Sequence, residues 1–438
     1  MDYLPDVAEG VLGLSYFKKY FDKANEVVNY SFIDEIFHVN QAEEFWNGNF
    51  HVWDPKITTP PGLYYLAYGW LKATGLEFTL ENLRLLNLVG GAVLLLTTYF
   101  VKRRSNRGVG ILSLFSSPLL TIYYTLFYTD IWSLVLVLQS FVISSSFEPS
   151  LLTATSASLF GFASLFFRQT NIIWLAFALA VMIDKLAKNQ YKDVLTQDIF
   201  VFVRKALTSW GIVSPFLMVF LAFANFVIQN GGITLGDSAN HVVVPHLTQV
   251  FYCFTFLTCF SIPLWLSPKF IDGYVQSLVA RKYLVLNAFW FFLIFFIVQN
   301  FSFVHPFILA DNRHYTFYIV RKILFRTEYS RFFLIPVYHF ASYTVYKLFT
   351  KNNSKVLYLA FLASVVLTIA PSPLFEPRYF IVPLAYWRLQ VQPEQSYSAL
   401  RLALESVWNY WFSKSLFDVY FNYVFQWEDL PDLQRIIW

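Results

Sequence analysis

The chain is 438 residues long, and 57% of its residues are hydrophobic whereas only 14% are charged. Because a soluble domain carries about 25% charged residues, this composition excludes a soluble enzyme, a disordered chain, a coiled coil and a nucleic-acid-binding protein. The formal net charge of +4 is less informative, since the placement of Lys and Arg matters more than their sum in a membrane protein.

A membrane-spanning helix needs about 20 apolar residues, and the apolar runs of this chain can supply about a dozen such helices. The runs are continuous, which disfavours an outer-membrane barrel with alternating strands. We therefore expect an all-α polytopic membrane protein with about 12 transmembrane helices. We expect it to form a single domain over residues 1–438.

In chain order, residues 1–31 are expected to form an amphipathic surface segment, because the charges at 18–23 would be costly in hydrocarbon. Residues 32–83 are expected to form a first polar loop with interfacial helices, one of them near 61–76. Residues 84–438 then form the multispan region. Its expected spans are 84–101, 109–127, 131–147, 150–166, 172–184, 212–229, 247–266, 284–301, 332–349, 356–370, 379–389 and 401–424.

The distribution of positive charge assigns the two sides of the membrane. Most Lys and Arg clusters in short loops fall on one side, which the positive-inside rule makes cytosolic. One basic cluster, Arg313 to Arg331, falls on the opposite side together with most of the polar, irregular segments. We interpret that opposite face as an active or binding face, where the misplaced cations could meet an anion.

The first candidate motif is FIDEIFH at 32–38, in which Asp34 and Glu35 precede a helical pattern that includes His38. A partly desolvated carboxylate at the bilayer surface can act as a general base. The alternative is that Asp34 is only a helix N-cap.

Two further motifs lie on the same expected face. In WDPKITTPPG, the prolines make a stiff loop in which Asp54 and Lys56 could contact a sugar or a phosphate, or else form only a rigid interfacial turn. In FRQTN, Arg168 could be a boundary anchor, whereas the neighbouring Gln169 and Asn171 favour ligand contact.

The densest polar patch runs from His305 through Asp311 to Arg313 and His314. Arg313 could bind phosphate through paired donors, with His314 beside it. The alternative is an amphipathic surface helix capped by Asp311.

In the last motif, SPLFEPRYF, Glu376 and Arg378 could pair with each other in a loop, or Arg378 could face an anion.

No sequence motif indicates a cofactor. The chain lacks GxxxxGK[ST], GxGxxG, HExxH and CxxC patterns, so nothing points to a nucleotide or zinc. Cys253 and Cys259 lie in one apolar run and suggest neither a disulfide nor a metal site. We expect no cofactor and no metal.

These motifs, together with YYTLFYTD, ITLGDSANH and the terminal QRIIW, resemble the dolichyl-phosphate-glucose-dependent alpha-1,2-glucosyltransferases of the endoplasmic reticulum. The resemblance runs in order from residue 32 to residue 438. It implies a C-type glycosyltransferase architecture with a lumenal active-site face. The chain departs from the family in one respect, since 1–31 offers no clear membrane helix before DEIFH.

The resemblance implies that glucose passes from dolichyl phosphate glucose to the terminal glucose of a diglucosylated, dolichyl-diphosphate-linked oligosaccharide. The alpha-1,2 linkage would form with inversion at the anomeric carbon, in a multi-pass protein of the endoplasmic reticulum membrane. Asp34 is the expected base and Glu35 the second choice. The expected donor-phosphate partners are, in order, Arg313, His314, Arg378, Lys56 and Arg168. The remaining expected substrate contacts are His38, Asp54, Gln169, Asn171, His305, Asp311 and Glu376.

Two alternatives stay open at this point. One is a mannosyltransferase of the same superfamily that uses dolichyl phosphate mannose. The other is a polytopic transporter, for which many spans and intramembrane charges are also typical.

Overall fold

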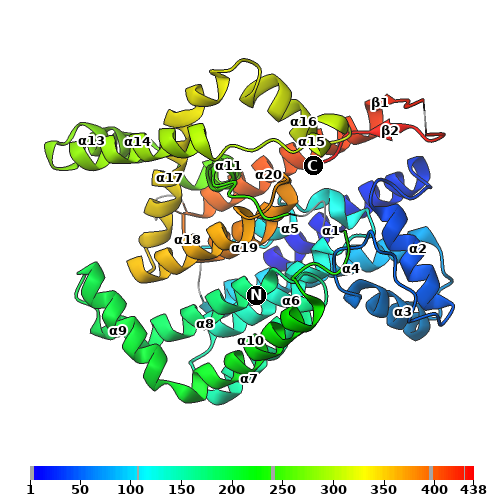
Figure 1. Ribbon diagram of the computed structural model, residues 1–438, viewed down its shortest axis with the longest axis horizontal. Helices are drawn as coiled ribbons and strands as arrows, with labels where there is room; N and C mark the ends of the chain where they lie inside the picture. The colour runs from blue at the N-terminus through cyan, green and yellow to red at the C-terminus, as the bar shows by residue number, and fades with distance from the viewer. Residues whose placement is uncertain (1–3, 106–107, 238–241, 394–397, 429) are drawn as a thin grey trace. The chain divides into compact units, whose positions relative to one another are not determined.

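The computed structural model describes residues 4–105, 108–237, 242–393, 398–428 and 430–438. Helices make up almost all of its regular structure (Figure 1). Within the described residues, three helical segments are long and apolar enough to cross a membrane: Leu80–Arg104, Trp210–Asn230 and Arg281–Asn300. Four shorter apolar helices accompany them. A helical protein with apolar helices able to cross a membrane is therefore confirmed, whereas the expected count of about 12 spans is not.

The chain divides into two compact units. Unit 1 comprises residues 1–106, 120–241 and 354–364, and unit 2 comprises 107–119, 242–353 and 365–438. Unit 1 contains α1 (Leu4–Val27), α2 (Glu35–Trp46), α3 (Gly62–Thr74), α4 (Leu80–Ser105), η1 (Thr121–Tyr124), α6 (Asp130–Ser146), α7 (Leu151–Leu165), α8 (Asn171–Ala187), η2 (Lys188–Gln190), α9 (Leu195–Thr208), α10 (Trp210–Asn230) and the first part of α18 (Lys355–Ile369).

The helices α4, α6, α7, α8 and α10 pack on one another to form the core of unit 1. Helix α7 begins at a capping box, in which Ser150 and Thr153 each satisfy the backbone N–H of the other. Helix α4 ends in Lys102, Arg103 and Arg104, cations that suit the negative end of a helix dipole.

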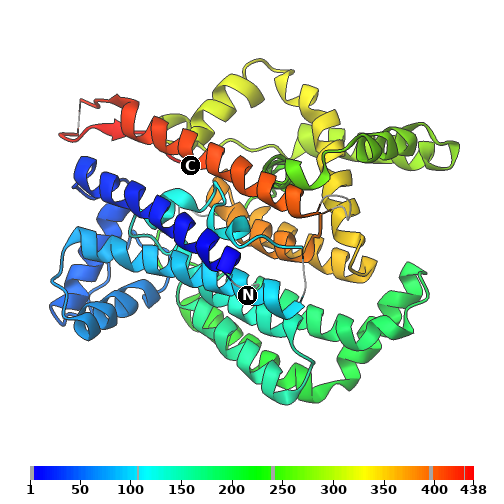
Figure 2. The same ribbon diagram turned by 180° about the vertical axis from the view of Figure 1, so that it is seen from behind.

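Helix α1 lies antiparallel along α4 (Figure 2). Near one end Asp6 accepts a hydrogen bond from Lys102, and near the other end Arg84 donates to the carbonyl of Val28 at 2.6 Å. The residues that α1 buries recur at helical spacing, and the charges at 18–23 lie on its other face. This helix is not among the candidate spans, so the expected amphipathic segment is a helix that covers the flank of α4.

Unit 2 is also helical and carries the one two-stranded sheet of the described chain. Its elements are α5 (Leu112–Phe115), α11 (Thr248–Phe260), α12 (Ile262–Trp265), α13 (Pro268–Val279), η4 (Arg281–Tyr283), α14 (Leu284–Asn300), α15 (Pro306–Ala310), α16 (Tyr315–Ile319), η5 (Val320–Leu324), η6 (Ser330–Leu334), α17 (Ile335–Thr350), the end of α18, η7 (Pro377–Phe380), α19 (Ile381–Gln390), α20 (Ser398–Asn422), β1 (Val424–Phe425) and β2 (Gln434–Arg435). The two strands are antiparallel, with Val424 opposite Arg435.

One expected span is wrong. The run 109–127 is apolar and almost wholly buried, yet it contains only the single turn α5 and the short η1. Pro118 lacks a backbone N–H and cannot continue a helix, and Ser116 and Ser117 precede it. Similarly, the expected span 247–266 breaks at Ser261, where Pro263 opens the short α12.

Candidate functional site

The backbone is strained immediately before Asp34. Ile33 has a φ of 54°, a left-handed conformation that is rare for a β-branched residue. Asp34 is half-buried, and its side chain makes no capping hydrogen bond to α2, so the interpretation as an N-cap is not supported. Its backbone N–H instead donates to the Tyr128 hydroxyl at 3.0 Å. Such strain costs about 1–3 kcal/mol and clusters at functional sites, which favours Asp34 as a functional residue.

Glu35 occupies a different environment, because its carboxylate is completely buried against Arg84. The Arg84 guanidinium donates to both carboxylate oxygens, at 2.8 and 2.6 Å. The backbone N–H groups of Phe127 and Phe32 donate to the same two oxygens. This arrangement satisfies the carboxylate within the fold, and it joins the start of α2 to α4 and to residue 127. We therefore keep Asp34, and not Glu35, as the candidate base.

His38 and Asp54 both lie around Tyr64. The Nδ1 atom of His38 is 2.8 Å from the Tyr64 hydroxyl. Burial, with a smaller contribution from the negative charge of Asp54, raises the pKa of Tyr64, so its hydroxyl stays protonated. The side chain of Gln41 accepts a hydrogen bond from the backbone N–H of Asp54 at 2.8 Å and so fixes this loop to α2.

Lys56 is exposed, and its ammonium group lies 5.3 Å from the centre of the Phe37 ring. No carboxylate pairs with it among the residues that the structure describes. Its charge is therefore available to an anion beside the Asp34 motif.

The FRQTN motif connects several loops of unit 1. The side-chain amide of Gln169 donates to the carbonyls of Thr58 and Ile233, at 2.8 and 3.1 Å. Asn171 is buried and donates to Ser133 at 2.9 Å. Both amides thus position loops, which gives them a structural role in addition to any contact with a ligand.

Arg168 pairs with Asp130 at 2.8 Å. The Nε atom of Arg168 and the Oδ2 atom of Asp130 are buried without a hydrogen-bond partner in the described chain. Buried polar atoms are normally satisfied, so this pair retains the capacity to bind a further polar group.

Close backbone approaches hold the same loops together. The N–H of Gly62 donates to the carbonyl of Phe166 at 2.8 Å, and a Cβ on Gly62 would lie 2.4 Å from that oxygen. Asp237 donates through its N–H to the carbonyl of Pro55 at 3.0 Å. The ITLGDSANH motif, which contains Asp237, continues into 238–241, which lie outside the described residues.

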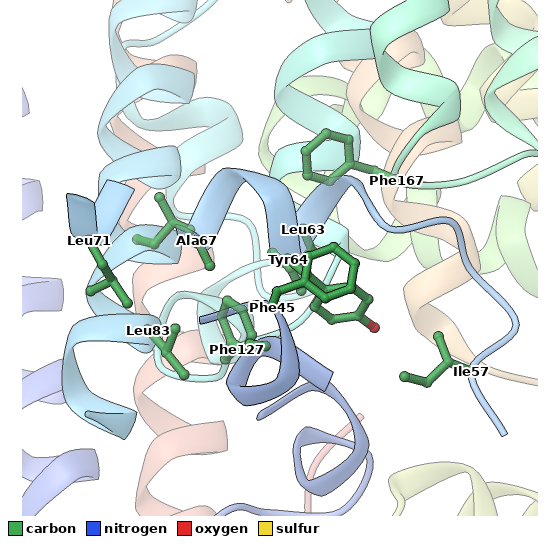
Figure 3. Close-up of a cluster of buried hydrophobic side chains, with 11 residues drawn as sticks. Phe45, Ile57, Leu63, Tyr64, Ala67, Leu71, Leu83, Phe127 and Phe167 are labelled. Carbon is green, nitrogen blue, oxygen red and sulfur yellow. The ribbon is translucent and has the colours of Figure 1, made fainter. Parts of the chain in front are cut away.

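Hydrophobic side chains from α2, α3, α4 and three connecting segments form one buried cluster under these loops (Figure 3). Phe45, Leu63 and Leu83 come from the helices, and Ile57, Phe127 and Phe167 come from the connecting segments. The first three sequence motifs are therefore brought together on one support within unit 1.

In unit 2, the segment 311–315 pairs with the C-terminal QRIIW motif. The N–H of Tyr315 donates to the carbonyl of Ile437, and the N–H of Ile437 donates to the carbonyl of Arg313, each at 2.8 Å. The ring of Trp438 packs against Tyr315, with ring centres 5.0 Å apart. Two motifs more than a hundred residues apart in the sequence are thus one structural feature.

Arg313 is held within this feature. Its Nε and one terminal nitrogen donate to Asp311, and the other terminal nitrogen donates to Gln434 at 3.2 Å. Its guanidinium also stacks 4.5 Å from the centre of the Trp427 ring. Burial alone would raise the pKa of Asp311, but the hydrogen bonds and charges of Arg313 and His314 lower it. Since every guanidinium nitrogen is used, this arrangement does not favour Arg313 as the first phosphate partner.

The other unit 2 candidates are also engaged. The Nδ1 atom of His314 is 2.9 Å from the carbonyl oxygen of Trp438. His305 caps α15 by accepting a hydrogen bond from the N–H of Phe307. Arg378 pairs with Glu376, as one of the two alternatives for that motif predicted.

Sequence reasoning missed Arg84, Tyr64 and Tyr128. Arg84 stood at the edge of an expected span, where a lone cation resembles a boundary anchor. Tyr128 belongs to the quoted YYTLFYTD motif, but nothing in the sequence indicated its contact with Asp34. Within the described residues, no group of three or more His, Cys, Asp or Glu side chains could hold a metal ion, and independence from metal stays a prediction.

Comparison with known proteins completes the description of the site. A profile of the DIE2/ALG10 family matches residues 28–389. A protein of Debaryomyces hansenii named Dol-P-Glc:Glc(2)Man(9)GlcNAc(2)-PP-Dol alpha-1,2-glucosyltransferase is 40% identical over 93% of this chain and 94% of its own length. Proteins of the same name from Candida albicans and Homo sapiens are 37% and 30% identical, over 85% and 95% of this chain and over 86% and 95% of their own lengths.

Proposed function

This chain belongs to the DIE2/ALG10 family, and we propose that it transfers glucose from dolichyl phosphate glucose to a diglucosylated lipid-linked oligosaccharide. The new linkage is alpha-1,2, and the product is the completed precursor for N-glycosylation. The single observation that carries this proposal is the 40% identity over 93% of the chain to a relative named for that reaction. The prediction of the family from sequence motifs is thereby confirmed.

In the proposed mechanism, Asp34 is the general base. It removes the proton from the 2-hydroxyl of the acceptor's terminal glucose as that oxygen attacks the anomeric carbon of the donor. The bond from that carbon to the phosphate oxygen breaks, and its electron pair leaves with dolichyl phosphate. One displacement inverts the anomeric carbon from beta to alpha. The backbone strain at the preceding residue, Ile33, and the absence of a capping hydrogen bond from the Asp34 side chain support this role.

The departing phosphate needs cations, because negative charge grows on its oxygens as the bond breaks. Lys56 is favoured by its lack of a carboxylate partner among the described residues. Arg168 is favoured as a second phosphate partner because its Nε is unsatisfied. Arg378 and His314 come next in this order of candidate phosphate partners. Arg313 has the least capacity to help, since each of its three guanidinium nitrogens already donates a hydrogen bond within the chain.

The neighbouring polar residues are proposed to position the sugars rather than to react. His38 and Asp54 adjoin the Asp34 motif through Tyr64 and Gln41. Gln169 and Asn171 hold the loops that carry them. His305, Asp311 and Glu376 are proposed to shape their loops within unit 2.

We further propose that the chain acts as one multi-pass enzyme of the endoplasmic reticulum membrane, with Asp34 on the lumenal side. The apolar helices α4, α10 and α14 support a membrane location. The partners are then the two lipid-linked substrates and the surrounding lipid, without nucleic acid.

The test is an assay of purified protein with dolichyl phosphate glucose and, separately, with dolichyl phosphate mannose, each with a diglucosylated lipid-linked acceptor. We expect transfer from the glucose donor alone. Transfer from the mannose donor would support the mannosyltransferase alternative. Transfer from neither donor would favour a different class, such as a transporter.

A further inference from the structure

Unit 2 contains a hollow of about 460 Å³ between α15, the segment that leads into it, and the elements α16 and η5. Small-ligand sites commonly enclose about 300–1,000 Å³, so the hollow has the size of such a site. All but one of its lining side chains are apolar. The lining residues are Val304, Leu309, Phe317, Val320, Arg321 and Phe325.

Arg321 is the charged member of this lining. It is exposed, and its guanidinium lies 5.6 Å from the centre of the Phe317 ring. Among the described residues no carboxylate pairs with it, in contrast to Arg313 and Arg378, which pair with Asp311 and Glu376. Arg321 belongs to the basic cluster from Arg313 to Arg331, which we expect on the side opposite to the one that the positive-inside rule predicts, and its donors are available to an anion.

The backbone at this point is irregular. Val320 to Leu324 form a π-helical turn, a conformation that occurs frequently at functional sites. The turn presents Val320 and Arg321 together to the hollow. A site built by an irregular turn is more consistent with a ligand contact than with simple packing.

The hollow also lies directly after a candidate membrane span. The span 281–300 ends at Asn300, and the lining begins at Val304. Apolar side chains beside it stay uncovered, since Leu309 and Ile323 are each 51% exposed. An apolar hollow with one cation near the end of a span matches an amphiphile whose anionic head lies at the membrane surface.

We propose that this hollow binds the first isoprenoid units of a polyisoprenyl phosphate and that Arg321 binds its phosphate. The inference rests on the proposed function, which supplies dolichyl phosphate glucose as a substrate and dolichyl phosphate as a product. Arg321 donates paired hydrogen bonds to phosphate oxygens, a geometry to which a guanidinium is suited. It thereby contributes to donor affinity, a role that the sequence motifs did not assign.

The test uses the full-length enzyme in lipid nanodiscs. Arg321→Gln removes the cation, and Lys322→Gln is the matched control, because Lys322 is the next residue, is exposed and does not line the hollow. Leu309→Trp fills the hollow from a position that is already half exposed. The KM and kcat for dolichyl phosphate glucose are measured at saturating acceptor, and the acceptor KM is measured at saturating donor. Dolichyl phosphate and inorganic phosphate are compared as competitors.

We expect Arg321→Gln to raise the donor KM by about tenfold or more, as the loss of a charged hydrogen bond implies, with little change in the acceptor KM. Leu309→Trp raises the donor KM as well, and Lys322→Gln leaves it within about twofold of the wild type. Dolichyl phosphate competes with the donor, whereas inorganic phosphate does not.

An unchanged donor KM in Arg321→Gln and Leu309→Trp overturns the inference, and equal competition by inorganic phosphate shows a free-phosphate site instead. The failure of the proposed function is seen separately, as a wild-type enzyme that makes no product. In that case the binding of radiolabelled dolichyl phosphate to wild-type and Arg321→Gln protein still tests the hollow.

Discussion

The buried pair of Glu35 and Arg84 predicts that Glu35 stabilises the fold, in contrast to the adjacent Asp34, which we propose as the base. In Glu35→Gln the side chain keeps its volume and a carbonyl oxygen but loses its charge. Arg84 is fully buried, so its guanidinium would remain without a counter-ion. Breaking a buried ion pair by removing one partner costs about 3–5 kcal/mol. That is a large fraction of the about 5–15 kcal/mol that stabilises a typical domain.

The assay is a thermal unfolding scan of detergent-solubilised protein by intrinsic fluorescence, for which the chain offers 13 Trp residues. We expect Glu35→Gln to unfold several degrees below the wild type and to yield less monodisperse protein. The matched control is Glu43→Gln on the same helix, an exposed carboxylate, which should not change the unfolding temperature. Replacing both partners, in Glu35→Leu with Arg84→Met, should recover part of the stability, because no charge is then left buried.

A Glu35→Gln protein that unfolds at the wild-type temperature but transfers no glucose would refute this reasoning. Glu35 would then be a chemical rather than a structural residue.

Three other predictions follow from the structure. Gly62→Ala should destabilise the loops around Asp34, because the new Cβ would lie 2.4 Å from the Phe166 carbonyl oxygen; limited proteolysis should show faster cleavage within 50–62 than in the wild type. Burial lowers the pKa of His246 from 6.5 to about 4, so only the unfolded chain takes up a proton between these values. The free energy of unfolding should therefore fall by up to about 3 kcal/mol as the pH falls from 6.5 to 4. The unfolding temperature of His246→Asn should depend less on pH over this range than that of the wild type. Finally, transfer should persist in EDTA; loss of activity that manganese or magnesium restores would indicate a required metal.

Much of the helical framework could be predicted from the apolar runs. The expected spans 131–147 and 150–166 correspond to α6 (Asp130–Ser146) and α7 (Leu151–Leu165), and 284–301 corresponds to α14 (Leu284–Asn300). The predicted span at 109–127 was wrong because hydrophobicity indicates that a segment is buried but does not indicate which backbone conformation it adopts. We expected no helix between the spans 172–184 and 212–229, where the structure has α9 (Leu195–Thr208), because the apolar residues of α9 lie on one face only.

The candidate site was harder to predict, because its contacts join distant segments. The motifs could be recognised in the sequence as groups of polar residues, but a sequence does not show that Glu35 pairs with Arg84 or that Arg313 pairs with Asp311. Neighbouring charges such as Asp34 and Glu35 look equivalent in a sequence. Their burial and hydrogen bonding distinguish Glu35, which holds the fold, from Asp34, which we propose as the base.

The central claim is that Asp34 is the base, and Asp34→Asn tests it most directly. The amide is almost isosteric and cannot accept the proton, and a general base contributes about 10²–10⁴-fold to a rate. We predict that purified Asp34→Asn protein unfolds at the wild-type temperature, while its rate of glucose transfer falls by a factor in that range. Transfer at a rate near that of the wild type would contradict the account.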